Sequence, residues 1–456
     1  MQLDSKPRSD RQAPDEQSRR VPIRLSWLHP NGLVSLSLAN FCLRLLTLGL
    51  YHFWGKTETR RHIWSAVRIE GEPLVYAGTG RELFLGFLIV FAVVLAPVLV
   101  SSVVVVTLFG ETGLDIFQVV LAVAFFYLTG VAVYRAKRYR LSRTHWRGIR
   151  GSLEGNSWRF GWLYLWTVVI PGLLALVIPS FYFYASRRGD PDAVIESLPY
   201  MAASAIMCLL VASWIVPWRS IKLQERLAGD MRFGNRPFRF SAPAAPLYVR
   251  FAGFWLGTAL LVTSVLAVAA QIISIDQLVE AGADPSPASA LNLAKAAALI
   301  YLLFGLAFLV YYLLSAFYRA FQFNHFAAYT HFDGATFRGT ATGPGLAWIA
   351  LGNFVLWLVG ALIGLVVMIA ALVLVRFVLE LPLAGIASQA LLTAALIVLL
   401  SSSGLFRPVM EARTVGYLAR NLSIDGLIDL SAIEQGRDQG ITRGEGLAQA
   451  FDVDAF

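Results

Sequence analysis

The residues with the most reactive side chains are few and scattered along the chain. There are six histidines and two cysteines, Cys42 and Cys208, and both cysteines lie in apolar segments. His325 and His331 lie close together, but no cysteine or acidic cluster accompanies them at the spacing of zinc ligands. The sequence also lacks a Walker A loop and a Gly-x-Ser-x-Gly turn. We therefore expect no catalytic residues, no metal site, no cofactor and no enzyme activity.

Long apolar segments make up much of the chain, so any functional site must be held in place by them. Hydrophobic residues make up 57% of the chain and charged residues 15%, whereas soluble domains carry about a quarter charged residues. Eight segments are long enough to cross a hydrocarbon core of about 30 Å. They cover approximately residues 83–109, 114–134, 160–184, 198–218, 248–273, 293–318, 346–375 and 383–406. The sequence thus predicts an all-α polytopic transmembrane bundle.

The interiors of these eight segments contain few polar groups. Away from the segment ends there is no Asp, Glu, Lys or Arg, and Asn353 and Gln389 are the strongest polar residues. Proton- and cation-coupled carriers usually place ionisable residues at mid-membrane, so a carrier of that kind is disfavoured. Passage of a neutral or amphipathic molecule needs no buried charge. Because Asn353 shares its segment with Gly352, Gly360 and Gly364, we interpret it as a helix-packing position.

A further apolar segment, residues 32–51, has two interpretations. It is long enough for a ninth span, but it carries Arg44, and crossing would place six N-terminal cations outside the cell. On a helix, Ser37, Asn40, Arg44 and Thr47 share one face. That stripe suits a span facing the bundle interior or a helix lying in the membrane interface, and both interpretations stay open.

The positive charge alternates between the two sides of the predicted spans. Counted along the sequence, 22 Lys and Arg residues lie in one set of connections and 4 in the other. Basic connections face the cytoplasm, so residues 52–82, 135–159, 219–247, 319–344 and the chain from about 407 are predicted to lie there. The formal charge of +9 then indicates the lipid bilayer and its anionic headgroups as partners, and not nucleic acid.

The basic connections resemble one another. Two of them share a Tyr-Arg-Ala string and a Thr-His-aromatic-x-Gly string, which begin at Tyr134 and Thr144 and again at Tyr318 and Thr330. Glycine turns between alternating flanks predict β-hairpins. The turns are centred on Gly71, Gly148, Gly234, Gly334 and Gly426. Because a lone hairpin is marginal in water, we expect short cytoplasmic β-hairpin modules that pair into a collar. The alternative is a short helix and coil in each connection.

One segment carries a family resemblance. An asparagine, a leucine-rich stretch, Thr-Leu-Gly-aliphatic-Tyr and a tryptophan are present as Asn40, Thr47, Gly49, Tyr51 and Trp54. This string resembles the signature of the YjgN-like family, a bacterial inner-membrane family of unknown function. Weaker matches extend the resemblance over roughly residues 25–430. It implies a multi-pass protein of the bacterial inner membrane and supplies no catalytic residues.

These patterns define three regions and two functional hypotheses. Residues 1–24 are polar, lack the apolar stretch of a signal peptide and are predicted to be a disordered tail. Residues 25–430 form the membrane domain with its internally repeated modules, and residues 431–456 form a flexible tail. The first hypothesis is transport or passage of a small neutral or amphipathic molecule. The alternative is a non-transporting scaffold that binds lipids or protein partners through the basic modules.

Overall fold

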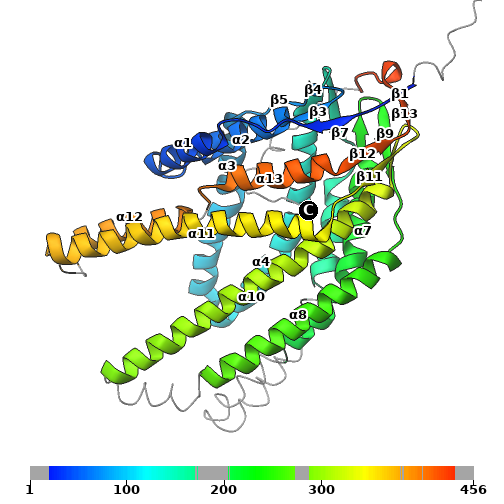
Figure 1. Cartoon of the computed structure of the whole chain (residues 1–456). Helices are drawn as coiled ribbons and strands as arrows, with labels where there is room; N and C mark the ends of the chain where they lie inside the picture. Colours follow the sequence, from blue (N-terminus) through cyan, green and yellow to red (C-terminus); the bar gives the residue numbers. More distant parts are fainter. Residues whose placement is uncertain are drawn as a thin grey trace, which may run out of the picture.

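The computed structural model describes residues 20–169, 206–272, 287–380, 385–402 and 404–436, together with residues 172, 204 and 382. The greater part of both predicted tails, residues 1–19 and 437–456, lies outside this part of the chain. Long helices extend from a layer of strands at one end of the molecule (Figure 1). The fold is therefore a helical assembly with its strands collected on one side.

Seven helical stretches in the described residues are long and apolar enough to cross a membrane. They are Gly80–Glu111, Gly113–Ser142, Ile206–Asp230, Ala245–Ala269, Lys295–Ala328, Gly343–Val378 and Ala387–Arg420. They correspond to seven of the eight predicted spans. The remaining one, residues 160–184, begins as a helix up to residue 169 and continues outside the described residues.

The helices themselves are divided at kinks and short turns. Their bounds are α3 (Gly80–Val90), α4 (Ala96–Ser142), α7 (Val216–Asp230), α8 (Ala245–Ile272), α10 (Pro287–Ala328), α11 (Gly343–Val373), α12 (Ile386–Ser402) and α13 (Arg407–Arg420). A π-helical turn, Phe91–Leu95, joins α3 to α4. Within α4, Gly110 has a φ of 65°, which only glycine adopts readily, and it separates the first two spans.

Residues 32–51 do not form one continuous helix. The structure has α1 (Leu33–Leu46), a turn and then α2 (His52–Ala66). The 14 residues of α1 extend about 21 Å, which is short of the roughly 30 Å hydrocarbon core. Leu48 and Gly49, with φ values of 50° and 93°, lie in the turn. The interpretation of this segment as a ninth span is therefore not supported.

The strands form one large sheet and two small ones. In chain order they are β1 (Arg20–Pro22), β2 (Leu25–Trp27), β3 (Val67–Ile69), β4 (Glu72–Pro73), β5 (Val75–Tyr76), β6 (Thr144–Trp146), β7 (Ile149–Leu153), β8 (Met231–Phe233), β9 (Arg236–Phe240), β10 (Thr330–Phe332), β11 (Ala335–Gly339), β12 (Leu422–Asp425) and β13 (Leu427–Asp429). The eight-stranded sheet has the order β12-β11-β10-β9-β8-β7-β6-β5. Strands β2, β3 and β4 form a second sheet, and β1 pairs with β13.

In the large sheet, strands from different connections between the helices also pair with one another, so hairpins from separate connections lie side by side. For example, Thr330 to Phe332 of β10 lie opposite Phe240 to Phe238 of β9 in antiparallel register. In the same way β7 pairs with β8, and β11 pairs with β12. Each ladder therefore ties one helix pair to the next at the strand end of the molecule.

The predicted turn glycines all have positive φ, but they do not all close hairpins. Gly71, Gly148 and Gly334 each follow a residue that also has positive φ, as in a type I′ turn. Gly234 occupies the first turn position between β8 and β9, as in a type II′ turn. The prediction of a hairpin at Gly426 is wrong, because β12 pairs with β11 while β13 pairs with β1. A single glycine between these strands redirects the chain from one sheet to another.

Both predicted tail boundaries need correction. Residues Arg20–Pro22 form β1 and lie opposite β13, although they belong to the tail predicted as disordered. At the other end, Ile433 is buried with Ile23 and Ile428 in an apolar cluster beside the strands. The backbone amide of Asn235 donates to the carbonyl of Glu434. Single apolar residues such as Ile23 and Ile433 hold these short segments against the strands. The mean hydropathy of a mostly polar segment does not reveal such single residues.

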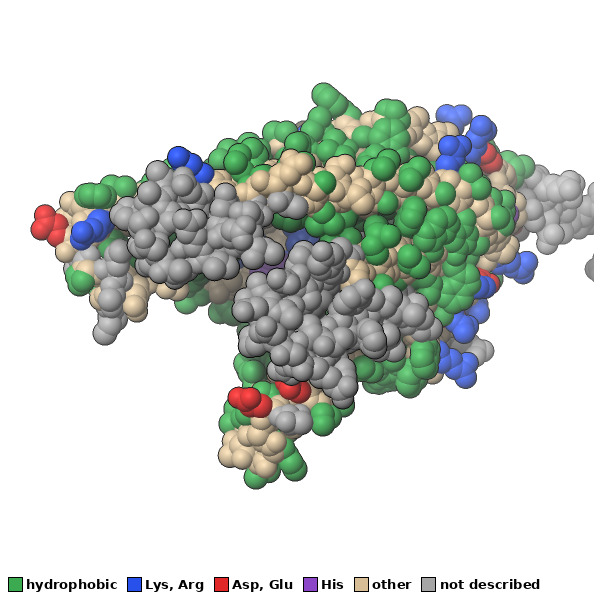
Figure 2. Space-filling model, turned by 90° about the horizontal axis from the view of Figure 1, so that it is seen from below, with side chains coloured by type: hydrophobic (Ala, Val, Ile, Leu, Met, Phe, Trp, Pro, Cys, Tyr) green, Lys and Arg blue, Asp and Glu red, His purple; other side chains and the backbone are tan. Residues whose placement is uncertain are grey.

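Side-chain types separate along the molecule. Aromatic side chains line the strands, where the rings of Phe238 and Phe332 stack with centroids 4.5 Å apart. Lys and Arg side chains gather at the strand end, and hydrophobic side chains cover the adjacent helices (Figure 2). Large apolar side chains remain exposed along the candidate spans, including Val104, Phe125, Leu302 and Leu362. Lipid tails are the solvent that suits such a surface.

Candidate functional site

A cavity of about 560 Å³ lies among α4, α7, α8, α10, α11 and α13. Its apolar and aromatic lining includes Phe160, Leu210, Phe251, Phe254, Trp255, Tyr311 and Tyr318. Its polar lining includes Lys137, Arg219, Ser220, Gln224, Arg319, Gln322 and Asn353. Ligand pockets in proteins typically measure about 300–1,000 Å³, so this cavity has the size of a binding site.

The cavity lies in the half of the helices next to the strands. Lys137 and Arg319 lie within the last three turns of α4 and α10, the helices that precede β6 and β10. Asn353 and Phe251 lie within the first three turns of α11 and α8, which follow β11 and β9. Because the sheet holds these helix ends at fixed positions, residues from distant parts of the chain surround one space.

The electrostatics of the cavity are one-sided. Three cations, Lys137, Arg219 and Arg319, line it, whereas no carboxylate of the described residues does. The Nε atom of Arg219 donates to Thr167 Oγ1 at 3.1 Å, and its guanidinium lies 4.7 Å from the centre of the Tyr164 ring. These contacts hold the charge at the wall. The cavity therefore offers an anionic group a cationic side and a hydrocarbon chain an aromatic side.

Two buried oxygen atoms in the wall have unused hydrogen-bonding capacity. The side-chain oxygen of Asn353 and the hydroxyl of Tyr318 have no hydrogen-bond partner among the described residues. The Asn353 amide nitrogen donates to Thr414 Oγ1 at 3.1 Å and so ties α11 to α13. Asn353 thus serves helix packing, as its sequence context predicts, and also borders the cavity. An unsatisfied buried oxygen is costly unless a ligand or water completes it.

The other two polar residues predicted to face the bundle lie elsewhere. Arg44 is half-buried on α1, with its guanidinium 6.0 Å from the Phe41 ring, and borders a second, smaller cavity. Gln389 is exposed in the first turn of α12, so its prediction as an interior polar group is wrong. The helix begins at Ile386, and this places Gln389 at a helix end and not at mid-membrane.

The residues of the family signature build the junction between α1 and α2. Asn40 donates to the carbonyl of Gly55 at 3.3 Å, and Thr47 Oγ1 accepts the backbone amide of Tyr51 at 2.9 Å. Gly49 supplies a φ of 93° between the helices. Trp54 packs on Phe84 of α3, with ring centroids 5.7 Å apart. None of these residues lines the large cavity, whereas Asn40 and Tyr51 border a second, smaller one.

Tyr51 also forms a polar contact at this junction. Its hydroxyl donates to the Glu58 carboxylate at 3.3 Å. Burial and the nearby Glu58 charge raise the pKa of Tyr51, so the hydroxyl keeps its proton.

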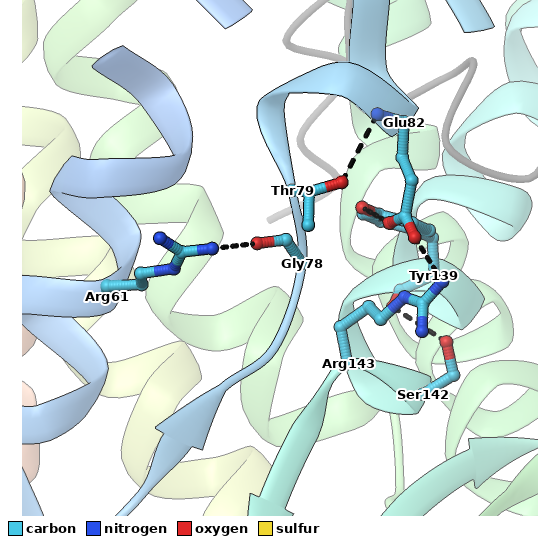
Figure 3. A network of polar contacts seen from close by, with 7 residues as sticks. All are labelled: Arg61, Gly78, Thr79, Glu82, Tyr139, Ser142 and Arg143. Carbon is cyan, nitrogen blue, oxygen red and sulfur yellow. Dashed lines mark hydrogen bonds and ion pairs between the residues drawn. The ribbon is translucent and has the colours of Figure 1, made fainter. Parts of the chain in front are cut away.

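A second junction joins the first span to the end of α4 (Figure 3). Glu82, in the first turn of α3, accepts hydrogen bonds from the Tyr139 hydroxyl and from Arg143, each at 2.6 Å. The Thr79 side chain caps the same helix by accepting the Glu82 amide at 3.3 Å. Sequence reasoning missed this junction, because Glu82 and Arg143 are 61 residues apart and each is an ordinary charge at a span end.

The histidines have ordinary structural surroundings. His325 is buried, its Nε2 atom lies 2.9 Å from the carbonyl of Pro243, and its ring contacts Phe321 and Tyr329. Within the described ranges, no three His, Cys, Asp or Glu side chains are grouped so that they could hold a metal ion.

Long apolar helices that converge on a layer of strands define a multi-pass α-helical membrane protein. The model of a bacterial protein family of unknown function, DUF898, matches residues 31–450, and the chain belongs to this family. The chain is 25% identical over 182 residues to the inner membrane protein YjgN of Salmonella typhimurium, covering 40% of this chain and 43% of that relative. The corresponding protein of Escherichia coli O157:H7 is 23% identical over 177 residues, covering 38% and 42%.

These comparisons confirm the resemblance to the YjgN-like family and the location in the inner membrane. The chain matches less than half of the length of these curated relatives. No solved structure matches it.

Proposed function

We propose that this protein binds an amphipathic molecule in the large cavity and passes it through the inner membrane. The observation that supports the proposal is the cavity itself. It measures about 560 Å³, and both cations and aromatic rings line it. A small ion would need few of these apolar contacts. A wholly apolar molecule would form no charge interaction with Arg219 and Arg319.

The composition of the lining favours an anionic or neutral headgroup with a hydrocarbon part. Arg219 and Arg319 attract negative charge, and Phe254 and Trp255 provide apolar surface. Because no carboxylate of the described residues lines the cavity, coupling to protons through a buried acid has no support there. The proposal includes no catalytic step and no cofactor.

The proposal places the strand end in the cytoplasm. The charge asymmetry of the connections supports this orientation, and the Lys and Arg side chains at the strand end agree with it (Figure 2). The paired connections then act as a repeated cytoplasmic module that holds the cytoplasmic ends of the spans together. In this arrangement the cavity lies in the cytoplasmic half of the membrane.

A scaffold role is the alternative, and the strand layer is the observation that favours it. Its ladders join connections that are far apart in the sequence into one sheet, which presents Arg150, Arg239 and Arg338. A basic surface of this kind could bind anionic headgroups or an acidic partner without any passage through the helices.

Flux measurements on matched cavity variants separate the two roles. The purified full chain is reconstituted into vesicles that contain a fluorescent anionic phospholipid, and its movement between leaflets is followed by quenching from outside. Thr258 lines the cavity, whereas Thr263, on the same helix, is exposed on the outside. Thr258→Trp fills part of the cavity, so we expect at least a tenfold slower movement. Thr263→Trp should match the unmodified protein.

The outcomes have distinct meanings. Movement that equals that of protein-free vesicles contradicts passage. Salt-sensitive binding of the same lipid to the reconstituted protein would then favour the scaffold role. Equal movement in both tryptophan variants would remove the large cavity from the pathway.

A further inference from the structure

The second, smaller cavity lies where the turn between α1 and α2 meets the start of α13. We propose that it holds the phosphate of an anionic phospholipid whose acyl chains lie along the exposed leucines of α1 and the following turn. This site is separate from the large cavity and does not depend on the proposed passage through it.

The dimensions of the smaller cavity suit a headgroup. Its volume is about 70 Å³, which is room for about five water-sized groups and too little for an acyl chain. It is bordered by Arg44, Lys56, Arg60 and Arg407, with Glu411 as the one carboxylate among the described lining residues. Arg407 and Glu411 form an ion pair at 3.1 Å. The lining keeps an excess of positive charge after that pair is formed.

Two buried groups hold this cavity in shape. Arg60 is 8% exposed, and its guanidinium lies over the rings of Trp64 and Tyr76 at 5.6 and 5.4 Å. Asn40 is 7% exposed, and its side-chain oxygen has no hydrogen-bond partner among the described residues. A hydroxyl of a glycerol headgroup is a donor that would satisfy this oxygen. The cavity thus pairs cations for a phosphodiester with an acceptor for the group beyond it.

The surface beside the cavity suits acyl chains. Leu43, Leu46, Leu48 and Leu50 are 38%, 80%, 89% and 52% exposed. A row of exposed leucines next to a basic cavity is the arrangement of a helix that lies in the membrane interface. The apolar helix α12 ends at Ser402, and Gly404 and Arg407 border the cavity directly after it. The cavity therefore lies at the level where a span leaves the hydrocarbon core.

Charge decides between kinds of lipid. A zwitterionic lipid with an ammonium group would bring a cation to a lining that is already positive, whereas an anionic lipid brings net negative charge. Inorganic phosphate shares the charge but gains nothing from the leucines. The occupant is therefore an anionic phospholipid and not free phosphate.

Ligand binding to the folded state raises the temperature of unfolding, and this provides the test. The full chain in detergent is titrated with phosphatidylglycerol, with phosphatidylcholine and with inorganic phosphate. The test variant is the double substitution R44Q/K56Q. Its matched control is R159Q/R226Q, which removes the same charge at two exposed cations that do not border either cavity. Thr258→Trp reports any contribution from the large cavity.

We expect phosphatidylglycerol to raise the unfolding temperature by several degrees in the unmodified chain, in R159Q/R226Q and in Thr258→Trp. The rise should fall to a third or less in R44Q/K56Q and persist in the charge-conserving R44K/K56R. Should R44Q/K56Q fail to fold, Arg407→Gln replaces it with the same expectation. An undiminished rise in the test variant, or an equal rise with phosphatidylcholine or inorganic phosphate, overturns the proposal.

Discussion

The second and fourth strand-bearing connections share three short strings, Tyr-Arg-Ala, Thr-His-aromatic-x-Gly and Arg-Gly, and each forms a helix end, a two-residue turn and a pair of strands. Tyr134 and Tyr318 are both buried near the ends of their helices. The turn positions Arg147 and Asp333 have φ values of 51° and 47°, and the glycines that follow them are positive as well. A repeated sequence has therefore produced a repeated helix, turn and strand pair.

The surroundings of the two copies differ. The Tyr134 hydroxyl donates to the Asp230 carboxylate at 2.7 Å and so closes a packed contact with the end of α7. The Tyr318 hydroxyl has no hydrogen-bond partner among the described residues and borders the large cavity. Tyr134 therefore forms a hydrogen-bonded contact between helices, whereas Tyr318 forms part of the wall of the candidate site. Similar local strings acquire different roles because different elements pack against them.

In the two copies, different helix side chains form hydrogen bonds with the backbone at or just after the end of the second strand, β7 or β11. Arg138 donates to the carbonyl of Leu153, the last residue of β7, at 2.9 Å. At the equivalent place Asn324 donates to the carbonyl of Ala341 at 2.7 Å and accepts its amide at 2.9 Å. Asn324 therefore binds both backbone groups of Ala341, beyond the end of β11, whereas Arg138 binds a carbonyl at the end of β7. This difference in contacts makes the two copies separately testable.

The largest difference is expected on removing the two tyrosine hydroxyls. Tyr134→Phe deprives the Asp230 carboxylate of a donor, so the free energy of unfolding should fall by about 1.5–3 kcal/mol. Tyr318→Phe removes a hydroxyl that is without a hydrogen-bond partner within 3.5 Å among the described residues, and the free energy of unfolding should change by less than about 0.5 kcal/mol. Denaturant titration of the purified variants in detergent measures both. Equal losses in the two variants would mean that the copies are equivalent after all.

A smaller contrast is expected at the glycines that end the shared Arg-Gly string. A Cβ atom at Gly339 would lie 2.8 Å from the Asn324 backbone, whereas one at Gly151 would lie 3.3 Å from the carbonyl of Leu141. Gly339→Ala should therefore cost about 1–3 kcal/mol of stability through overpacking. Gly151→Ala should cost less than about 1 kcal/mol, since alanine also lowers the entropy of the unfolded chain. The same titrations apply, and a costlier Gly151→Ala would contradict the tighter packing around Gly339.

The smallest effect concerns His145 in the second copy. Burial lowers the pKa of His145 below its usual 6.5, and the charges of Arg150 and Arg143 act in the same direction. Between that lowered value and 6.5, the unfolded chain binds a proton that the folded chain does not. Stability should therefore decrease as the pH falls through 6.5, and His145→Gln should show a shallower decrease. Parallel pH profiles for the two proteins would rule out this contribution.

Much of the architecture follows from local patterns. Apolar length located seven of the helical spans, because a membrane requires long uninterrupted hydrocarbon surface. Glycines with positive φ located the turns at Gly71, Gly148, Gly234 and Gly334, because few other residues adopt that conformation. Gly426 satisfied the same local rule and closes no hairpin. The strand β12 pairs with β11, which is far away in the sequence, and not with β13, which follows it directly. The local sequence around Gly426 carries no information about such a distant partner.

The candidate site was beyond local prediction for the same reason. Asn353 was identified by its polarity within an apolar segment, and Gln389 was identified in the same way, but only the first borders the large cavity. Arg219 and Arg319 were counted as ordinary basic residues of the connections.

The membrane setting, the likeness to an inner-membrane family and the repeated turns follow from the sequence, since they depend on composition and on short strings. Only the tertiary structure shows that α1 stops after 14 residues and that helices from distant parts of the chain enclose one cavity. It also shows that the Tyr134 hydroxyl is hydrogen-bonded to Asp230, while Tyr318 borders that cavity. These outcomes depend on contacts between segments far apart in the chain, and such contacts form only when the sheet brings the helix ends together.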